Sequence, residues 1–88
     1  MIEISLKELT NMAKSTRCCP ICGITLDYSL KKGKIFMNSP SWDRKYNQNI
    51  LTQENTWIIC YKCNTTKHDR TIQEFISYCK TVIKNLEE

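Results

Sequence analysis

The sequence lacks any apolar stretch long enough to cross a membrane as a helix. Its first residues have no apolar run flanked by basic residues and no small-residue cleavage site, so no secretory signal is evident. Internal repeats and low-complexity segments are also missing. We therefore expect an intracellular, cytoplasmic protein. Its 88 residues allow one domain, whose small core favours stabilisation by a metal or by disulfides.

Cysteine, by contrast, is plentiful. Four of the six cysteines form two Cys-x-x-Cys pairs, namely Cys19, Cys22, Cys60 and Cys63. In a reducing compartment such pairs are more often metal ligands than disulfides. No βαβ pattern surrounds either pair, which argues against a thioredoxin-like redox site. The spacing predicts one structural Zn²⁺ held by these four thiolates. The neighbouring Cys18 leaves the register of the first ligand open, and Cys79 fits a helix core better than a metal site.

Three segments have helical patterns. Near the N-terminus, SLKE has the spacing of a capping box before an apolar stripe, which predicts a helix over residues 5–15. Near the C-terminus, TIQE has the same spacing before a longer stripe, which predicts a helix over residues 71–85. A further helix is expected to open within residues 61–68, at the second cysteine pair.

The segment 56–59 is β-branched and aromatic, which favours a strand. Further extended segments are expected at 25–28, 35–38 and 39–44, with a basic turn at 31–34 and a polar loop at 45–54. The predicted fold is a small α+β zinc domain that covers residues 1–88. Trp57, inside the clearest strand, is expected in the core.

Zinc does not explain a second set of polar residues: Asp43, Arg44, Asn55, Asn64 and His68. Asn64 and His68 are four apart, so on a helix they would share a face. Asp43 offers a hard carboxylate suited to magnesium or manganese. Taken singly, each residue also has a plain structural explanation: a surface ion pair, a turn, a helix cap or an exposed helix position.

The order of these motifs resembles a known family. The chain carries Cys-Pro-x-Cys-Gly, then Ser-Pro-Ser-x-Asp-Arg, then an Asn-led strand that ends in Cys-x-x-Cys-Asn-x-x-Lys. This order, from about Cys19 to Phe75, is similar to that of zinc-containing HNH endonucleases, in particular the small ones common in phage genomes. The resemblance implies a ββα-metal core, in which two strands and a helix hold a catalytic Mg²⁺ or Mn²⁺, buttressed by zinc. It also implies metal-dependent hydrolysis of DNA phosphodiester bonds.

The resemblance assigns roles by position. Asp43 and Asn64 match the ligands of the catalytic ion, Asn55 matches the Asn that orients the active-site loop, and His68 lies where some relatives have another histidine. Arg44 departs from the pattern, because the family usually has its general base there and a guanidinium cannot release its proton. Arg44 can instead hold a phosphate. Three routes stay open: His68 is the base, a metal-bound water suffices, or the domain does not cut.

The net charge of +4 permits a polyanionic partner. We expect DNA contacts from Arg44, Lys45, Lys62, Lys67 and Arg70, and stacking on bases or ribose from Trp42, Tyr46 and Tyr61. We expect either weak sequence preference or sequence specificity supplied by a partner protein. Two alternatives to a nuclease remain: an HNH-derived zinc module that binds nucleic acid or a host protein without cutting, and a purely structural zinc domain.

Overall fold

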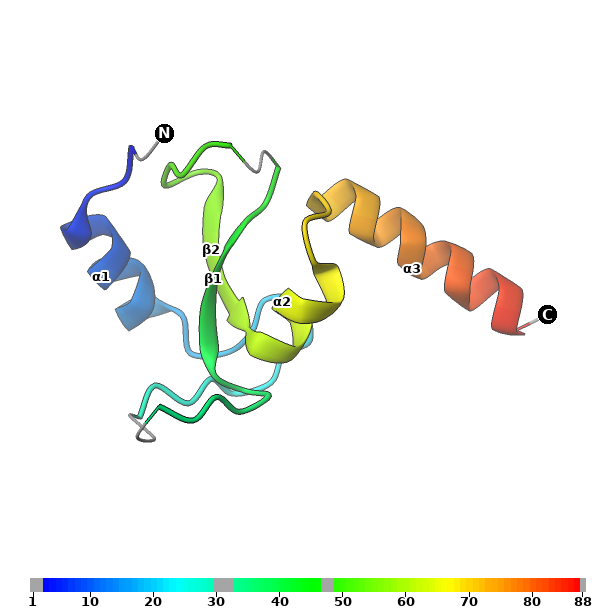
Figure 1. The fold of residues 1–88 in the computed structure, drawn as a ribbon, viewed down its shortest axis with the longest axis horizontal. Helices are drawn as coiled ribbons and strands as arrows, with labels where there is room; N and C mark the ends of the chain where they lie inside the picture. Colours follow the sequence, from blue (N-terminus) through cyan, green and yellow to red (C-terminus); the bar gives the residue numbers. More distant parts are fainter. Residues whose placement is uncertain (1–2, 30–32, 47–48, 88) are drawn as a thin grey trace.

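The computed structural model of the chain describes residues 3–29, 33–46 and 49–87. The elements are, in chain order, α1 (Leu6–Ser15), β1 (Pro40–Arg44), β2 (Thr56–Cys60), α2 (Tyr61–Lys67) and α3 (Ile72–Glu87). The fold is a small α+β arrangement, in which α1 lies on one side of the strand pair and α2 on the other (Figure 1). None of the described helices is long and apolar enough to span a membrane.

The two strands form an antiparallel sheet in which Pro40 pairs with Cys60 and Arg44 pairs with Thr56. β2 is TWIIC, and its β-branched residues suit a pleated, buried surface. Ile58 and Ile59 are buried and pack with Leu26 and with three buried cysteines. The predicted strands at 39–44 and 56–59 are therefore confirmed, and the core lies where β2 meets the cysteine motifs.

α2 follows β2 without a loop. Cys60 has an extended backbone and acts as the N-cap of α2, because its sulfur accepts a hydrogen bond from the Cys63 amide at 3.3 Å. The second cysteine pair thus lies across the strand-to-helix junction. The helix is only seven residues long and ends at Lys67.

The predicted N-terminal helix is confirmed. Ser5 is the N-cap of α1, and its side chain and that of Glu8 exchange hydrogen bonds with each other's backbone amides as a capping box. Ile4, just before the cap, is buried. Glu3 then donates its amide to the Leu51 carbonyl at 2.8 Å, which links the start of the chain to the loop before β2.

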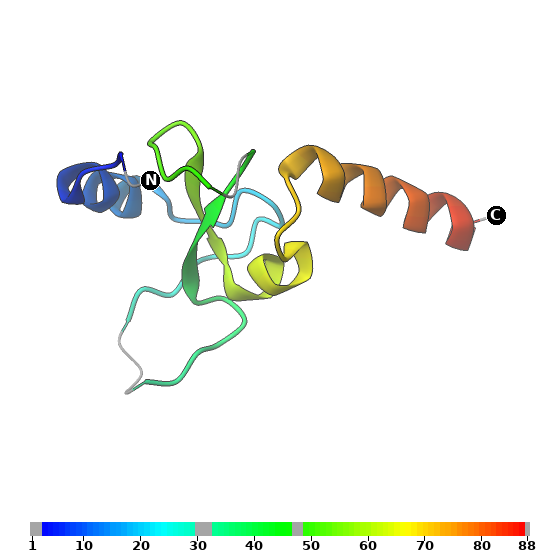
Figure 2. The same ribbon diagram turned by 45° about the horizontal axis from the view of Figure 1, so that its top comes forward.

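The strands predicted at 25–28 and 35–38 are wrong. Within the described part of these segments, an isolated bridge between Cys18 and Thr25 is the sole strand-like pairing. The segments instead form a long loop that Figure 2 shows below the sheet. Ile35 and Phe36 are exposed by 62% and 44%, so neither has a buried surface to pack on. Residues 31–32, half of the basic turn predicted at 31–34, lie outside the described residues.

The predicted C-terminal helix is confirmed, with bounds of Ile72–Glu87. Thr71 and Glu74 form the predicted capping box. The start of α3 is held to the strand pair by a 2.7 Å hydrogen bond from the Ile72 amide to the Lys45 carbonyl. Beyond its first turns α3 extends away from the rest of the molecule (Figure 1).

Candidate functional site

Four cysteine thiols gather where the turn after α1 meets the junction of β2 and α2. The sulfurs of Cys19, Cys22, Cys60 and Cys63 all lie within 4.8 Å of one another, so together they could hold a metal ion. The Cys22 and Cys60 sulfurs are 3.7 Å apart. A tetrahedral ion with metal–sulfur bonds of about 2.3 Å spaces its ligands by about 3.8 Å, which fits this separation. Cys18 is exposed and lies outside the cluster. Of the two neighbouring cysteines that the sequence left open, Cys19 is therefore the candidate ligand.

The first cysteine pair sits on a tight turn. The Gly23 amide donates to the Cys19 carbonyl at 2.8 Å, and the Cys19 amide donates to the Ile24 carbonyl at 2.8 Å. Gly23 has a φ of 82°, a left-handed conformation that side chains disfavour. The glycine of the motif is therefore required by the backbone, and the turn directs the first two sulfurs toward the second pair.

The thiols differ in acidity without a metal. Burial raises the pKa of Cys19, but hydrogen bonds from the backbone at Cys22, Cys60 and Ile21 outweigh it and lower that pKa to about 7. Burial raises the pKa of Cys60 and of Cys63. A neighbouring thiolate at Cys19 raises the pKa of Cys63 further. Without a cation, the cluster therefore carries one readily ionised thiol, Cys19, and two thiols, Cys60 and Cys63, that hold their protons more firmly.

A polar pocket of about 360 Å³ opens between β1 and α2. Its walls bring together residues that are more than 20 positions apart in the sequence. It is lined by Trp42, Asp43, Arg44, Asn64, Thr65, His68 and Asp69. Four of the five polar residues singled out from the sequence therefore face one pocket.

Asp43 is buried at the edge of this pocket. Its Oδ2 atom accepts hydrogen bonds from Lys67 Nζ at 2.9 Å and from Trp57 Nε1 at 2.8 Å. Lys67 is fully buried and also donates to the Arg44 and Arg70 carbonyls. Among the described residues, the other carboxylate oxygen, Asp43 Oδ1, accepts no hydrogen bond. The carboxylate is thus held in place by one oxygen and keeps the second for another ligand.

Asn64 has a comparable arrangement. Its amide nitrogen donates to Ser41 Oγ at 2.9 Å and to the Trp42 carbonyl at 3.3 Å. The carbonyl can only accept a hydrogen bond, so the amide nitrogen must face it and the orientation of the side chain is fixed. Asn64 Oδ1 has no partner within the described residues. Asp43 and Asn64 therefore both line the pocket with an uncommitted oxygen atom.

Two buried side-chain polar atoms lack a hydrogen-bond partner in the described part of the chain, Arg44 Nε and Thr56 Oγ1. They belong to residues that pair across the two strands. An unpaired buried donor is costly, and native proteins usually satisfy it with water or a ligand. Arg44 also lines the polar pocket, where the rest of its guanidinium group suits an anionic oxygen.

His68 follows the end of α2 and does not continue the helix as its spacing from Asn64 predicted. It is the C-cap, with a φ of 58° and a ψ of −132°, and its amide donates to the Asn64 carbonyl. Its exposed side chain still reaches the pocket.

Within the described residues, the cysteine cluster is the only group of three or more cysteine, histidine or acidic side chains close enough to share a metal ion.

Asn55 lies outside the pocket but makes the kind of contacts that the resemblance implies. Its side-chain oxygen accepts the Tyr46 amide at 2.7 Å, and its amide nitrogen donates to the Ile50 carbonyl at 2.6 Å. The Asn55 carbonyl also accepts the Lys45 amide at 2.7 Å. Asn55 therefore links both ends of the loop that connects β1 with β2.

The predicted DNA contacts need one correction. Lys67 cannot reach a phosphate, because it is fully buried and its ammonium group binds Asp43 and two carbonyls. Lys62 is exposed, and Lys45 lies 5.4 Å from the centre of the Trp57 ring. Arg70 is half-buried and stacks 4.7 Å from the centre of the Tyr78 ring. These three and Arg44 retain some access to solvent.

Sequence reasoning missed the roles of Lys67 and Trp57. Trp57 is half-buried and packs against the core, as expected, but its indole N–H also holds Asp43. Lys67 lies four residues after Cys63, on the same buried face of α2, and that spacing was the available signal for its burial.

No known protein family, curated protein or solved structure matches this chain.

Proposed function

We propose that this protein is a metal-dependent endonuclease of the HNH type that hydrolyses DNA phosphodiester bonds in the pocket between β1 and α2. One observation carries the proposal: Asp43, Arg44, Asn64 and His68 line a single open pocket. Two further observations support it. Asp43 and Asn64 each have one side-chain oxygen without a hydrogen-bond partner among the described residues, and the Arg44 Nε–H has no partner there either. The strand–strand–helix order of β1, β2 and α2 agrees with a ββα-metal core.

In this proposal the cysteine cluster holds a structural zinc ion. Thiolate ligands favour soft metals, and a closed set of four thiolates is the usual structural zinc site. The ion would link the turn after α1 to the junction of β2 and α2. Because three of the cysteines pack with Ile58 and Ile59 of β2, the ion would fix the frame on which the polar pocket is built.

Magnesium or manganese would be held by Asp43 Oδ1 and Asn64 Oδ1, which are the hard oxygen ligands these ions prefer. When bound, the ion would stabilise the charge that develops on the phosphate and the leaving oxygen. Arg44 lines the pocket, and its guanidinium group binds a phosphate oxygen there. His68 accepts the proton of the attacking water, since Arg44 has no proton acceptor to offer.

Residues around the pocket keep these groups in position. Lys67 and Trp57 hold Asp43 through its Oδ2 atom, and Ser41 holds the amide nitrogen of Asn64. The exposed Lys62, with Lys45 and Arg70, contacts phosphates of the duplex on either side. Such contacts position the backbone without reading the bases, so the domain alone cuts with little sequence preference.

The test is a plasmid-cleavage assay with magnesium, manganese or EDTA. His68→Ala changes an exposed side chain and leaves the fold intact, and the loss of a general base lowers the rate by about 10²–10⁴-fold. Thr66→Ala, on the exposed side of α2, is the matched control and keeps the wild-type rate. Wild-type protein that is folded and zinc-loaded but cuts nothing would contradict the proposal, as would equal cutting by His68→Ala.

One observation favours the alternative of a binding module that does not cut. The Lys67 ammonium already neutralises the Asp43 carboxylate, which weakens the attraction of Asp43 for a cation. In that case the protein would still bind duplex DNA with an affinity that falls as salt rises. Binding measured by fluorescence anisotropy, without cleavage under any metal condition, would support this second function.

A further inference from the structure

The apolar stripe of α3 is largely uncovered. Only Phe75 is buried on this helix, whereas Ile76, Ile83 and Leu86 are exposed by 46%, 55% and 77%. Figure 1 shows the C-terminal half of α3 extending beyond the rest of the molecule. In proteins an amphipathic helix of this length owes most of its stability to packing of its apolar face. The stripe therefore calls for a contact that one copy of the chain does not supply.

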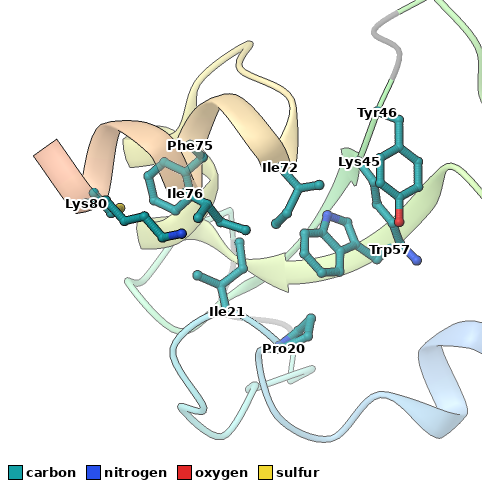
Figure 3. Close-up of a pocket in the computed structure, with 10 residues that line it drawn as sticks. Pro20, Ile21, Lys45, Tyr46, Trp57, Ile72, Phe75, Ile76 and Lys80 are labelled. Atoms are coloured by element: carbon teal, nitrogen blue, oxygen red, sulfur yellow. The ribbon is translucent and has the colours of Figure 1, made fainter.

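An apolar groove of about 470 Å³ lies beside the N-terminal half of the same helix. Ile21, Tyr46 and Trp57 form one wall, and Ile72, Ile76 and Cys79 of α3 form the other (Figure 3). The groove thus begins where α3 leaves the body of the protein. It continues directly into the exposed stripe.

The apolar positions of α3 are symmetric about Cys79. Ile76, Phe75 and Ile72 precede Cys79 by three, four and seven residues, and Val82, Ile83 and Leu86 follow it by the same intervals. Two antiparallel copies of α3 that cross at Cys79 would therefore match each apolar side chain with an apolar side chain. The same crossing lays the C-terminal half of one helix along the N-terminal half of the other, where the groove opens.

We propose that a second copy of this chain covers the stripe and the groove, in an antiparallel two-fold dimer centred on Cys79. Each copy inserts Val82, Ile83 and Leu86 into the groove of the other. A 16-residue helix is about 24 Å long, and two such helices with the groove walls bury on the order of 1,000 Å² in total. This area is near the lower limit for a specific interface, so the dimer forms at micromolar concentrations.

Sedimentation equilibrium of the metal-loaded full chain from 1 to about 500 μM tests the proposal. The wild type shifts from monomer to dimer across this range, whereas Ile83→Glu and Leu86→Glu stay monomeric. Both side chains are exposed in the single copy, so far-UV circular dichroism at low concentration stays unchanged. Ser77→Glu, two residues before Cys79 and on the other side of the helix, is the matched control and still dimerises.

Cross-linking tests the antiparallel crossing. In a Cys18→Ser background, an added oxidant removes two electrons and two protons from two Cys79 thiols, and one disulfide joins the copies. Cys79→Ser abolishes this covalent dimer. Leu86→Cys placed in the chain that lacks both Cys18 and Cys79 does not cross-link, because antiparallel copies keep the two position-86 residues apart. A wild type that is monomeric at all concentrations, a dimer that survives both glutamate substitutions, or self-cross-linking at position 86 would overturn the proposal.

Discussion

At the scale of single residues, the ion pair between Asp43 and Lys67 is the least expected feature of the molecule. The Lys67 side chain is 0% exposed and that of Asp43 is 4% exposed, so neither charge is solvated by water. Burial of a charge is costly unless it is paired and hydrogen-bonded. Lys67 meets that condition with one carboxylate and two carbonyls, and Asp43 meets it with Lys67 and Trp57.

Removal of one partner leaves the other charge buried and unpaired. We therefore expect Lys67→Ala to lower the free energy of unfolding by about 3–5 kcal/mol, as measured by urea denaturation of the metal-loaded protein. The double variant Lys67→Met with Asp43→Leu recovers most of this loss, because both charges are then absent. Lys62→Ala, an exposed lysine on the same helix, changes the free energy of unfolding by less than about 0.5 kcal/mol. A loss below about 1 kcal/mol for Lys67→Ala would show that its burial is not maintained in solution.

At the scale of elements, α3 begins with a capping box that also makes the carboxyl group of Glu74 more acidic. The backbone amide of Thr71 donates to Glu74 Oε1 at 2.9 Å, and the Thr71 hydroxyl accepts the Glu74 amide at 3.2 Å. Hydrogen bonds from Thr71 lower the pKa of Glu74. Since the folded-state pKa lies below the unfolded-state value, the stabilisation is complete above the unfolded-state pKa. It is lost as the pH falls through the folded-state pKa.

Thr71→Ala removes the hydroxyl half of this box. We expect the first turn of α3 to lose about 1 kcal/mol of stability, seen as faster amide hydrogen exchange there. The pKa of Glu74 then rises toward its ordinary value, because its carboxylate is held less firmly, and an NMR titration of the Glu74 side chain follows that change. Ser77→Ala, an exposed residue within the helix, leaves both readouts unchanged. An unshifted Glu74 titration in Thr71→Ala would mean that the backbone amide alone sets its charge.

At the scale of the whole molecule, the cysteine cluster links two parts of the chain that are far apart in the sequence. Its first pair follows α1, and its second pair spans the junction of β2 with α2. The core around it is small, and three of its six buried members are the cysteines themselves. If the four thiols hold a metal ion as proposed, a chain with so small a core draws much of its folding energy from that binding.

We expect one metal ion per chain by elemental analysis, and loss of the far-UV circular dichroism signal of the folded state when a strong chelator removes it. Binding displaces the protons that Cys60 and Cys63 otherwise retain, so affinity falls as the pH is lowered. Each displaced proton weakens binding by about tenfold per pH unit. Cys63→Ser weakens binding strongly, whereas Cys18→Ser, outside the cluster, does not. A chain that keeps its fold without metal at neutral pH would contradict this prediction.

The sequence by itself determined the local features. Capping boxes predicted the starts of α1 and α3, β-branched residues predicted β2, and two Cys-x-x-Cys pairs predicted the metal cluster. These signals are local because caps, turns and strand propensity depend on neighbours within a few residues. The weak strands at 25–28 and 35–38 failed for the same reason, since a strand needs a distant partner and a surface to cover.

Only the tertiary structure decided which polar residues meet. It brought Asp43 and Arg44 of β1 to Asn64 and His68, and it buried Lys67 against Asp43 where the sequence predicted a DNA contact. It also showed that α3 leaves its apolar stripe uncovered. Long-range packing fixes burial and pairing, and a lysine in the sequence is the same residue whether it faces water or a carboxylate. The chemistry available to this chain was therefore present in its residues, but their partners were set by the fold.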